Sequence, residues 1–547
     1  MDNRGTNFIT AFPENIAYYF PKNLNYLKIT ILYPNTDVSV IYGGDGVNNT
    51  RSFSTAGITW TLNFTKDVEE YQLTSSNKSI IIRSNNNITV LSMTGWAERL
   101  QSEVVQPEQN LRTVYTIPTL NYAEVIGAFD LSVSSVARYN SFRLLIINAV
   151  NATNTVSIKG VVTGGQNQVP LNPYFLYQLE SNGEVTEVSG TDKIAVILTH
   201  PCFDSNCSCN MMMSQLRPVM PNGAFDRFPI TVGFPYINQL FLTTSQSVQV
   251  AVGDPPAGTG IQVSSSTNIL PLLNGVNYGP QLITTSMPVS LRLIIPGIIL
   301  DIFPVSMFSG CFLVHFYSSK TRAFIIAETS STASVQMNDA PLSAATWDVI
   351  SGTQYSITTI GTGNTQPISA TIWHPDSKIA VYMTEMWNSG KYTSPAIIIN
   401  EEPDPNGCMV LTPGKFVVGN EDLNWTMSRE YCNSNSSNFV KILLKQNQDM
   451  MAANIIVPEP TEGWISLRRS LFNTEWYWSN SDNTTTPLNF TYWADKQPGI
   501  PVRGLCAAVS MDPGKTFMWK SARCCSLKKP ICYKLPVYLS LSQTPVY

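Results

Sequence analysis

The feature that most restricts the fold of this chain is a series of cysteines and tryptophans at short intervals over residues 425–532. It opens with NWTMSREYC, in which Trp425, Ser428 and Cys432 have the three- and four-residue spacing of one helix face. Asp422 and Asn424 precede them as candidate helix caps. GWISL, WYWSN, YWADKQP, GLCAAV and MWKSARCCSLKKPIC then follow in that order. In an oxidising compartment the cysteines of this region can pair internally.

Two further elements are expected inside this region. NFVKI, at 438–442, has the character of a strand. QNQDMMAANII, at 446–456, predicts a second helix because Met451 and Ile455 lie four residues apart.

The remaining composition indicates a large, mainly β chain. Its 547 residues are too many for one hydrophobic core, and the length favours three or four domains. Hydrophobic residues make up 43% and charged residues only 13%, and runs such as KIAVILTH and SVQVAV are short and β-branched. The net charge of −4 is spread without a basic stripe, which argues against a nucleic-acid partner.

Cysteines and glycosylation motifs both favour an extracellular protein. The ten cysteines divide into six between Cys408 and Cys532 and four between Cys202 and Cys311. The HPCFDSNCSC segment does not have zinc-ligand spacing, so we expect a disulfide cluster there rather than a metal site. That cluster would consist of Cys202, Cys207, Cys209 and Cys311. The Asn-x-Ser/Thr motifs expected to carry glycans are at Asn48, Asn63, Asn77, Asn87, Asn151, Asn424, Asn435, Asn483 and Asn489, with a tenth at Asn206.

Targeting signals are not apparent in the sequence. The opening MDNRGTNFITAF has no basic start followed by an apolar stretch, so we expect a removed leader or a late start. The best apolar run, Leu291–Leu300, is interrupted by Pro296 and Gly297 and is too short to span a bilayer. The expected location is therefore secreted, without a membrane span.

Residues 1–400 contain a weak internal repeat. One recurring piece is a short strand, seen as TDVSV, TVSI, SVQV and SVQM, and a second piece closes each unit, as in NITVLSMT and DKIAVILT. The period of about 90–115 residues predicts stacked all-β modules, approximately 1–120, 121–220, 221–310 and 311–399. We favour β-sandwich-like modules, with propeller-like blades as the alternative, because blades are usually shorter. NEEPDPNG, at 400–407, is expected to be a linker before a domain at 408–547.

The cysteine and tryptophan series closely resembles the C-type lectin-like domain, over residues 408–535. The resemblance implies an α+β fold with Cys432–Cys532 and Cys506–Cys524 disulfides. Cys408 and Cys525 depart from the family pattern. They are the two cysteines left over in this region, so the simplest assignment is a disulfide between them. The alternative is that one of them is free or forms a bond between chains.

The residues that bind calcium in the family are different in this sequence. Sugar-binding relatives use a Glu-Pro-Asn or Gln-Pro-Asp triplet and a Trp-Asn-Asp triplet as oxygen ligands. Here the triplets are Gln497-Pro498-Gly499 and Trp519-Lys520-Ser521, and GIPVRGL, which follows Pro498, has no acidic residue. Calcium needs six to eight oxygens, whereas Gly499 offers no side chain and Lys520 would add a positive charge. We therefore expect no metal and no other cofactor.

The expected ligand-binding face is the loop region around these triplets. Its candidate contacts are Gln497, Trp493, Arg503, Lys520 and Trp478. The tryptophans have a second interpretation, in which they fill the core and brace the long loop as in the family. The basic side chains have one as well, as ordinary solvated surface charges.

The repeat region resembles the N-terminal region of the IgG-Fc-binding proteins of mucus. The resemblance rests on GTNFITAFPEN, VSGTDKIAVILTHPC, a cysteine cluster and QLRPV. Family members typically have proline where this chain has Ile194, so the match is partial. It implies an extracellular protein of mucus or a surface coat, and it does not imply immunoglobulin binding.

Enzymatic motifs are missing from the sequence. The three histidines, His200, His315 and His374, lie in no nucleophile motif, and no phosphate-binding loop precedes a helix. We therefore expect a secreted, non-enzymatic recognition protein of innate defence, mucus or a surface coat, which binds a glycan or an extracellular protein. The alternative is a structural or adhesive protein whose lectin-like part is only a scaffold. Homo-oligomer formation stays open in either case.

Overall fold

The protein, analysed as a computed structural model, divides into two compact units. The larger unit is Met1–Met409 with Leu539–Tyr547, and the smaller one is Val410–Tyr538. Cys408, Met409 and the last residues are thus in the larger unit, although the sequence analysis assigned them to the C-terminal domain. The structure describes residues 2–14, 24–44, 46, 48–64, 68–96, 99–121, 125, 141–160, 166–200, 211–218, 226–231, 239–253, 260–264, 266–270, 280–295, 298–342, 344–350, 352–364, 366–387, 390–472, 474–512 and 517–542.

The first module of the larger unit is one sheet organised around a very long strand. Strand β9 (Ile80–Trp96) pairs with β1, β3, β4 and β10, and β5 and β6 complete the sheet. Alternating buried residues, such as Val38 and Val40 of β4, give it a dry inner face. The other strands of this sheet are β1 (Gly5–Thr10), β3 (Leu24–Ile31), β4 (Thr36–Tyr42), β5 (Asn48–Phe53), β6 (Thr59–Phe64) and β10 (Arg99–Val104). Strands β2 (Phe12–Pro13) and β7 (Glu69–Glu70) pair with each other in parallel, apart from this sheet.

The second module repeats this plan around β16 (Glu187–His200). This strand pairs with β11, β12, β13 and β17, in an eight-stranded sheet. The short strand β8 (Ser75–Ser76), from the chain of the first module, also joins this sheet. Its other strands are β11 (Arg112–Thr116), β12 (Phe142–Asn148), β13 (Asn154–Lys159), β14 (Gln168–Leu171), β15 (Leu176–Ser181) and β17 (Met212–Gln215).

The third and fourth modules each contain two separate sheets, as a sandwich does. The third has the orders β18-β23-β20-β21 and β22-β19-β24-β25, and the fourth has β29-β28-β32-β26-β35 and β30-β31-β27-β33-β34. The third module's strands are β18 (Asp226–Thr231), β19 (Gln239–Thr244), β20 (Val248–Val252), β21 (Ile261–Val263), β22 (Ser266–Ile269), β23 (Pro280–Thr285), β24 (Ser290–Ile295) and β25 (Ile298–Ile302). Those of the fourth are β26 (Cys311–Phe316), β27 (Thr321–Glu328), β28 (Gln336–Met337), β29 (Ala340–Pro341), β30 (Asp348–Val349), β31 (Tyr355–Ile360), β32 (Ile368–Trp373), β33 (Ala380–Trp387), β34 (Gly390–Pro395) and β35 (Ile397–Asn400).

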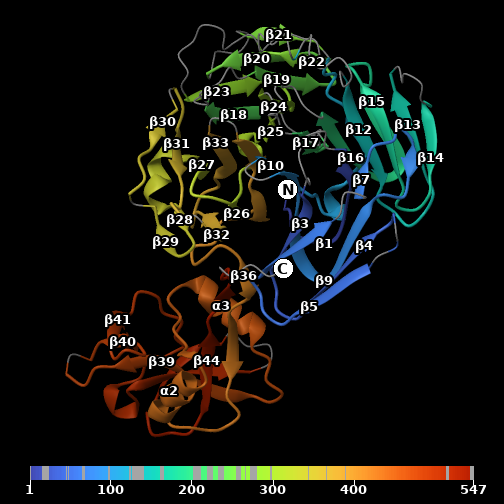
Figure 1. The fold of residues 1–547 in the computed structure, drawn as a ribbon. Helices are drawn as coiled ribbons and strands as arrows, with labels where there is room; N and C mark the ends of the chain where they lie inside the picture. The colour runs from blue at the N-terminus through green and yellow to red at the C-terminus, as the bar shows by residue number, and fades with distance from the viewer. Residues whose placement is uncertain are drawn as a thin grey trace. The chain divides into compact units, whose positions relative to one another are not determined.

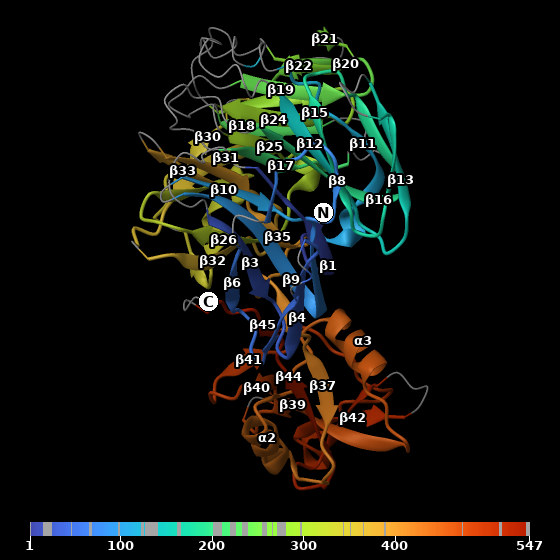
Figure 2. The same ribbon diagram turned by 45° about the vertical axis from the view of Figure 1, so that its right-hand side comes forward.

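The sequence repeat corresponds to a structural one. The second repeated piece lies in β9, β16, β24 and β33, and each of these strands is followed by an antiparallel partner: β10, β17, β25 and β34. These four partners contact one another in a closed cycle, β10 with β17, β17 with β25, β25 with β34 and β34 with β10. Figures 1 and 2 show β10, β17 and β25 near the middle of the larger unit. The modules therefore surround a shared inner set of strands.

Charged side chains occupy the region where these strands meet. The Arg292 Nε atom lies 2.8 Å from the Asp301 carboxylate, and the Arg217 guanidinium lies 4.6 Å from the centre of the Phe303 ring. Burial raises the pKa of Glu103, and Asp301 raises it further, against the opposing effect of the nearby guanidinium groups. Arg217, from the QLRPV segment, therefore belongs to this central contact region.

The smaller unit has the expected two helices and a mixed sheet. Helix α2 (Trp425–Ser434) begins after Asn424, whose side chain accepts a hydrogen bond from the Met427 N–H at 2.9 Å. Its buried face is Trp425, Ser428 and Cys432, as predicted. The other elements are α3 (Lys445–Asn454), β36 (Val410–Thr412), β37 (Lys415–Val418), β38 (Asn438–Phe439), β39 (Thr461–Arg469), β40 (Trp476–Ser479), β41 (Thr485–Pro487), β42 (Cys506–Met511), β43 (Trp519–Ala522), β44 (Lys529–Lys534) and β45 (Val537–Tyr538).

Two disulfides of this unit are those that the resemblance implied. Cys432 bonds to Cys532 and Cys506 bonds to Cys524. The first joins α2 to β44, across 100 residues of sequence, and the second joins β42 to the segment after β43, across 18 residues.

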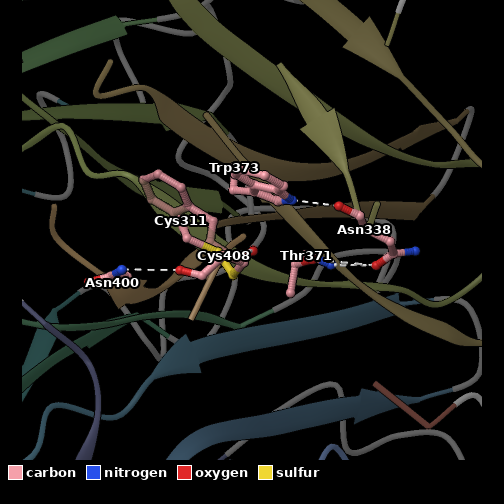
Figure 3. The surroundings of a disulfide bond; sticks show 7 residues. Cys311, Asn338, Thr371, Trp373, Asn400 and Cys408 are labelled. Atoms are coloured by element: carbon pink, nitrogen blue, oxygen red, sulfur yellow. Dashed lines mark hydrogen bonds between the residues drawn. A yellow bond between two sulfur atoms is a disulfide. The ribbon is translucent and has the colours of Figure 1, made fainter. Parts of the chain in front are cut away.

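The predicted Cys408–Cys525 bond is wrong. Cys408 bonds instead to Cys311, the first residue of β26, and Cys525 is a free, exposed cysteine. Figure 3 shows this bond beside Trp373 and Asn400, whose side chain donates to the Cys408 carbonyl at 3.1 Å. The proposed role of Cys311 in a cluster is therefore also wrong. Cys202, Cys207 and Cys209, like Asn206, lie outside the described residues.

The expected linker is attached to the fourth module at several points. The Gly310 N–H donates to the Glu401 carbonyl at 3.0 Å, and Lys378 pairs with Glu402 at 2.6 Å. Together with the Cys311–Cys408 bond, these contacts place the segment along the edge of the module.

Candidate functional site

The candidate site is the long loop between β41 and β42, together with β43. Four tryptophans support it from below: Trp519 lies 5.5 Å from Trp478 and 5.6 Å from Trp493 between ring centres, and Trp476 lies 4.8 Å from Trp493. The backbone is fastened as well, because the Ala494 N–H donates to the Trp519 carbonyl at 2.9 Å. The loop is therefore held by aromatic packing and strand-like hydrogen bonds.

These contacts decide the role of two predicted ligand residues. Trp478 is fully buried and Trp493 is half-buried between two other tryptophans, so their main role is to brace the loop. The prediction that Trp478 contacts a ligand is wrong, because none of its ring surface is accessible. The alternative interpretation of these side chains as core is the correct one for Trp478.

Gln497 is at the centre of a compact hydrogen-bond network. Its Oε1 atom accepts from the Ser521 N–H at 3.1 Å, from the Ser521 hydroxyl at 2.9 Å and from the Gly499 N–H at 3.2 Å. The Gly499 N–H also donates to the Ser521 hydroxyl oxygen at 2.9 Å. The peptide bond between Gln497 and Pro498 is cis. The amide oxygen thus receives three donors from the protein itself, more than its two lone pairs accommodate ideally.

Lys520 does not point into this network. Its ammonium lies 3.3 Å from Glu462 and 3.0 Å from the Ser510 hydroxyl, and Lys528 also pairs with Glu462. Burial acts to raise the pKa of Glu462, but hydrogen bonds and charge from Lys528 and Lys520 outweigh it and hold the pKa below its usual value.

The expectation of an ammonium beside Gln497 is therefore wrong. Successive side chains of a strand point to opposite faces, so β43 can direct only one of Lys520 and Ser521 toward the loop. It directs Ser521 there, a residue that the sequence analysis recorded only as a missing calcium ligand.

Basic and apolar side chains complete the outer surface of the loop. Arg503 is exposed on a short 3₁₀ turn (Pro501–Arg503), and Arg469 donates from its Nη1 atom to the Gly499 carbonyl at 3.1 Å. Ile500 and Val502 are 62% and 84% exposed, which the sequence analysis did not anticipate. The sequence signal that could have indicated this exposure is a hydrophobic residue flanked by glycine and proline within a loop.

Metal-binding groups and membrane helices were also sought in the described parts of the chain. There, no three or more His, Cys, Asp or Glu side chains are grouped so as to hold a metal ion. Among those same residues, none of the helices has both the length and the apolar character needed to cross a bilayer.

The glycosylation motifs lie mostly at the surface. Asn87 and Asn424 are half-buried, and Asn424 serves as the cap of α2. The exposed asparagines are Asn48, Asn63, Asn77, Asn151, Asn435, Asn483 and Asn489.

Comparison with known proteins agrees with this geometry in the smaller unit. Residues 421–534 match the model of the family described as Lectin C-type domain. These residues form a C-type lectin-like domain. Solved structures similar to the domain include human lithostathine, at 22% identity over 22% of this chain and 88% of that chain, with a TM-score of 0.19. Cow CD23, solved in the presence of a GlcNAc2Man3 oligosaccharide, is 22% identical over 23% of this chain and 89% of its own, with a TM-score of 0.19. A calcium-independent type II antifreeze protein is 16% identical over 23% and 88% of the two chains, with a TM-score of 0.20.

A different relative matches a larger share of the chain. Human IgGFc-binding protein is 21% identical over an alignment of 382 residues, which covers 66% of this chain. The chain spans only 7% of the length of that relative. The chain therefore combines a lectin-like domain with a region similar to part of IgGFc-binding protein.

Proposed function

We propose that this chain is a secreted, non-enzymatic recognition protein. Its lectin-like domain binds a glycan or an extracellular protein through the long loop, without calcium. The domain type and the similarity to IgGFc-binding protein both favour binding over catalysis. The disulfides and the exposed glycosylation motifs favour an extracellular setting, in innate defence, mucus or a surface coat.

The observation that carries this proposal is the hydrogen-bond network around Gln497. A carbonyl oxygen that receives three protein donors has little electron density left to offer a cation. Gly499 provides no side-chain ligand, and calcium prefers several carboxylate or amide oxygens. The network itself gives the loop a defined conformation through protein hydrogen bonds alone.

The test is a glycan array probed with the full chain, with and without a chelator. We expect bound glycans to be retained in the chelator, and Arg503→Ala to weaken an acidic glycan more than a neutral one. Calorimetry with calcium should give no heat of tight binding. A micromolar calcium site that is lost in Gln497→Ala would contradict the proposal.

An array on which no glycan is bound would indicate either a protein ligand or the alternative function as a structural or adhesive protein. Sedimentation of the full chain separates these two, since a structural or adhesive protein should associate with itself. Self-association together with a silent array would favour the adhesive function over recognition.

A further inference from the structure

Four apolar side chains project from two neighbouring loops of the lectin-like domain. Leu471 and Phe472 are 69% and 98% exposed in the connection between β39 and β40. Ile500 and Val502, in the long loop, are 62% and 84% exposed. We call these four residues the apolar tips. Large apolar side chains are usually buried away from water. Several that are exposed at one place mark an interaction surface.

Arg469 connects the two loops. Its Nε atom donates to the Thr474 carbonyl at 2.7 Å, and its Nη1 atom donates to the Gly499 carbonyl at 3.1 Å. Its backbone N–H donates to the Leu505 carbonyl at 2.7 Å. One guanidinium therefore holds both loops, two residues from Phe472 on one side and one residue from Ile500 on the other. The apolar tips consequently belong to one surface.

The charges around the tips are mainly basic on the long loop. Arg503 and Lys496 are exposed, and residues 499–505 contain no acidic side chain. The acidic side chains closest in sequence are Glu475, just before β40, and Asp495, beside Lys496 in the long loop. A cationic side chain next to projecting apolar ones suits a surface that is both apolar and negatively charged.

We propose that the apolar tips dock onto a phospholipid bilayer that contains anionic headgroups. A side chain that is 84% or 98% exposed is a projection, and a rigid protein partner would need a matching recess for each one. A fluid bilayer accommodates all four at once, with Phe472 at the depth where aromatic rings favour the interface. Arg503 would then lie among the headgroups. The four tips are side chains other than those of the Gln497 network, while Arg503 is also the proposed contact for an acidic glycan.

The test is co-sedimentation of the full chain with vesicles of phosphatidylcholine alone and of phosphatidylcholine mixed with phosphatidylserine. We expect partitioning onto the mixed vesicles, and a decrease of about tenfold or more in Phe472→Ser/Val502→Ser, because each buried side chain of this size contributes more than one tenfold step. Arg503→Glu should reduce the preference for phosphatidylserine. Ile456→Ser is the matched control, since Ile456 is 91% exposed just after α3 and should not contribute.

Three outcomes would overturn the proposal. The first is equal partitioning of the double variant and the unsubstituted chain, and the second is an equal loss in the double variant and the Ile456 control. The third is an absence of vesicle binding, and a dimer that disappears in the double variant would then make the tips a contact between two copies. Circular dichroism of each variant verifies that a loss is not caused by unfolding.

Discussion

At the scale of single residues, Ser521 determines the conformation of the long loop. Its hydroxyl donates to Gln497 and accepts from the Gly499 N–H, so Ser521→Ala removes two hydrogen bonds. At roughly 1 kcal/mol each, their loss should increase the population of an open loop by about tenfold or more. Limited trypsin digestion should therefore cleave after Lys496 or Arg503 correspondingly faster.

Ser481→Ala is the control for this prediction. Ser481 is exposed on a loop of the same domain, and its side chain has no part in the network. Equal cleavage rates in both variants would mean that the tryptophans alone hold the loop.

The residue scale is also where the sequence was least informative. Reading the triplet Trp519-Lys520-Ser521 as a string placed all three side chains near one site, but a strand separates neighbours onto two faces. Trp478 had two consistent interpretations, and only its fully buried position decided between them. Identity and spacing predicted which residues matter, and the direction of each side chain required the strand register.

At the scale of elements, the Cys311–Cys408 bond fastens the segment after β35 to β26. Both cysteines are buried, and the bond closes a segment of 97 residues. Replacing both by serine should lower the free energy of unfolding by about 2–5 kcal/mol, because a long unfolded loop is released. Urea unfolding of the full chain, followed by the near-ultraviolet signal, measures this change.

Cys525→Ser provides the matched control, since this thiol is exposed and unbonded. Its substitution should leave the urea midpoint unchanged, and iodoacetamide should label Cys525 without prior reduction. A non-reduced peptide that links Cys408 to Cys525 would contradict the structure.

Elements were predicted well wherever the pattern was local. Alternation predicted the strands of residues 1–400, and helical spacing predicted α2, because both depend on neighbours a few residues away. The partner of Cys408 could not be found in this way. It depends on β26 pairing with β35, a contact between residues almost 90 positions apart. The sequence analysis instead paired the two cysteines left over in one region, and this pairing was wrong.

At the scale of the whole molecule, the larger unit is closed by contacts between its first and last modules. Asn3 is fully buried, its N–H donates to the Ile398 carbonyl at 2.9 Å, and its side chain accepts from the Ile398 N–H at 2.7 Å. The repeat in the sequence indicated several similar modules. It contained no signal that the first module meets the fourth, since Asn3 and Ile398 are 395 positions apart.

A second contact between the first and fourth modules makes the stability of the larger unit dependent on pH. The Lys28 ammonium of β3 lies 4.2 Å from the Tyr317 ring centre, and His315 of β26 is buried, with Nδ1 2.8 Å from the Ser369 hydroxyl. Burial lowers the pKa of His315 to about 3, and the Lys28 charge acts in the same direction. Burial also lowers the pKa of Lys28, to about 8, so Lys28 is still largely protonated at neutral pH.

The sign of the effect follows from proton uptake on unfolding. Between pH 6.5 and 3 the unfolded chain binds a proton at His315 that the folded chain excludes, so acidification favours unfolding. The free energy of unfolding should fall by about 2 kcal/mol between pH 6.5 and pH 5, at 1.36 kcal/mol for each unit. Calorimetric unfolding across this range measures the slope. His315→Gln keeps a group that can hydrogen-bond to Ser369 but does not titrate, so its slope should be smaller by that amount. Equal slopes in the two proteins would mean that His315 takes up its proton without opening the contact between the first and fourth modules.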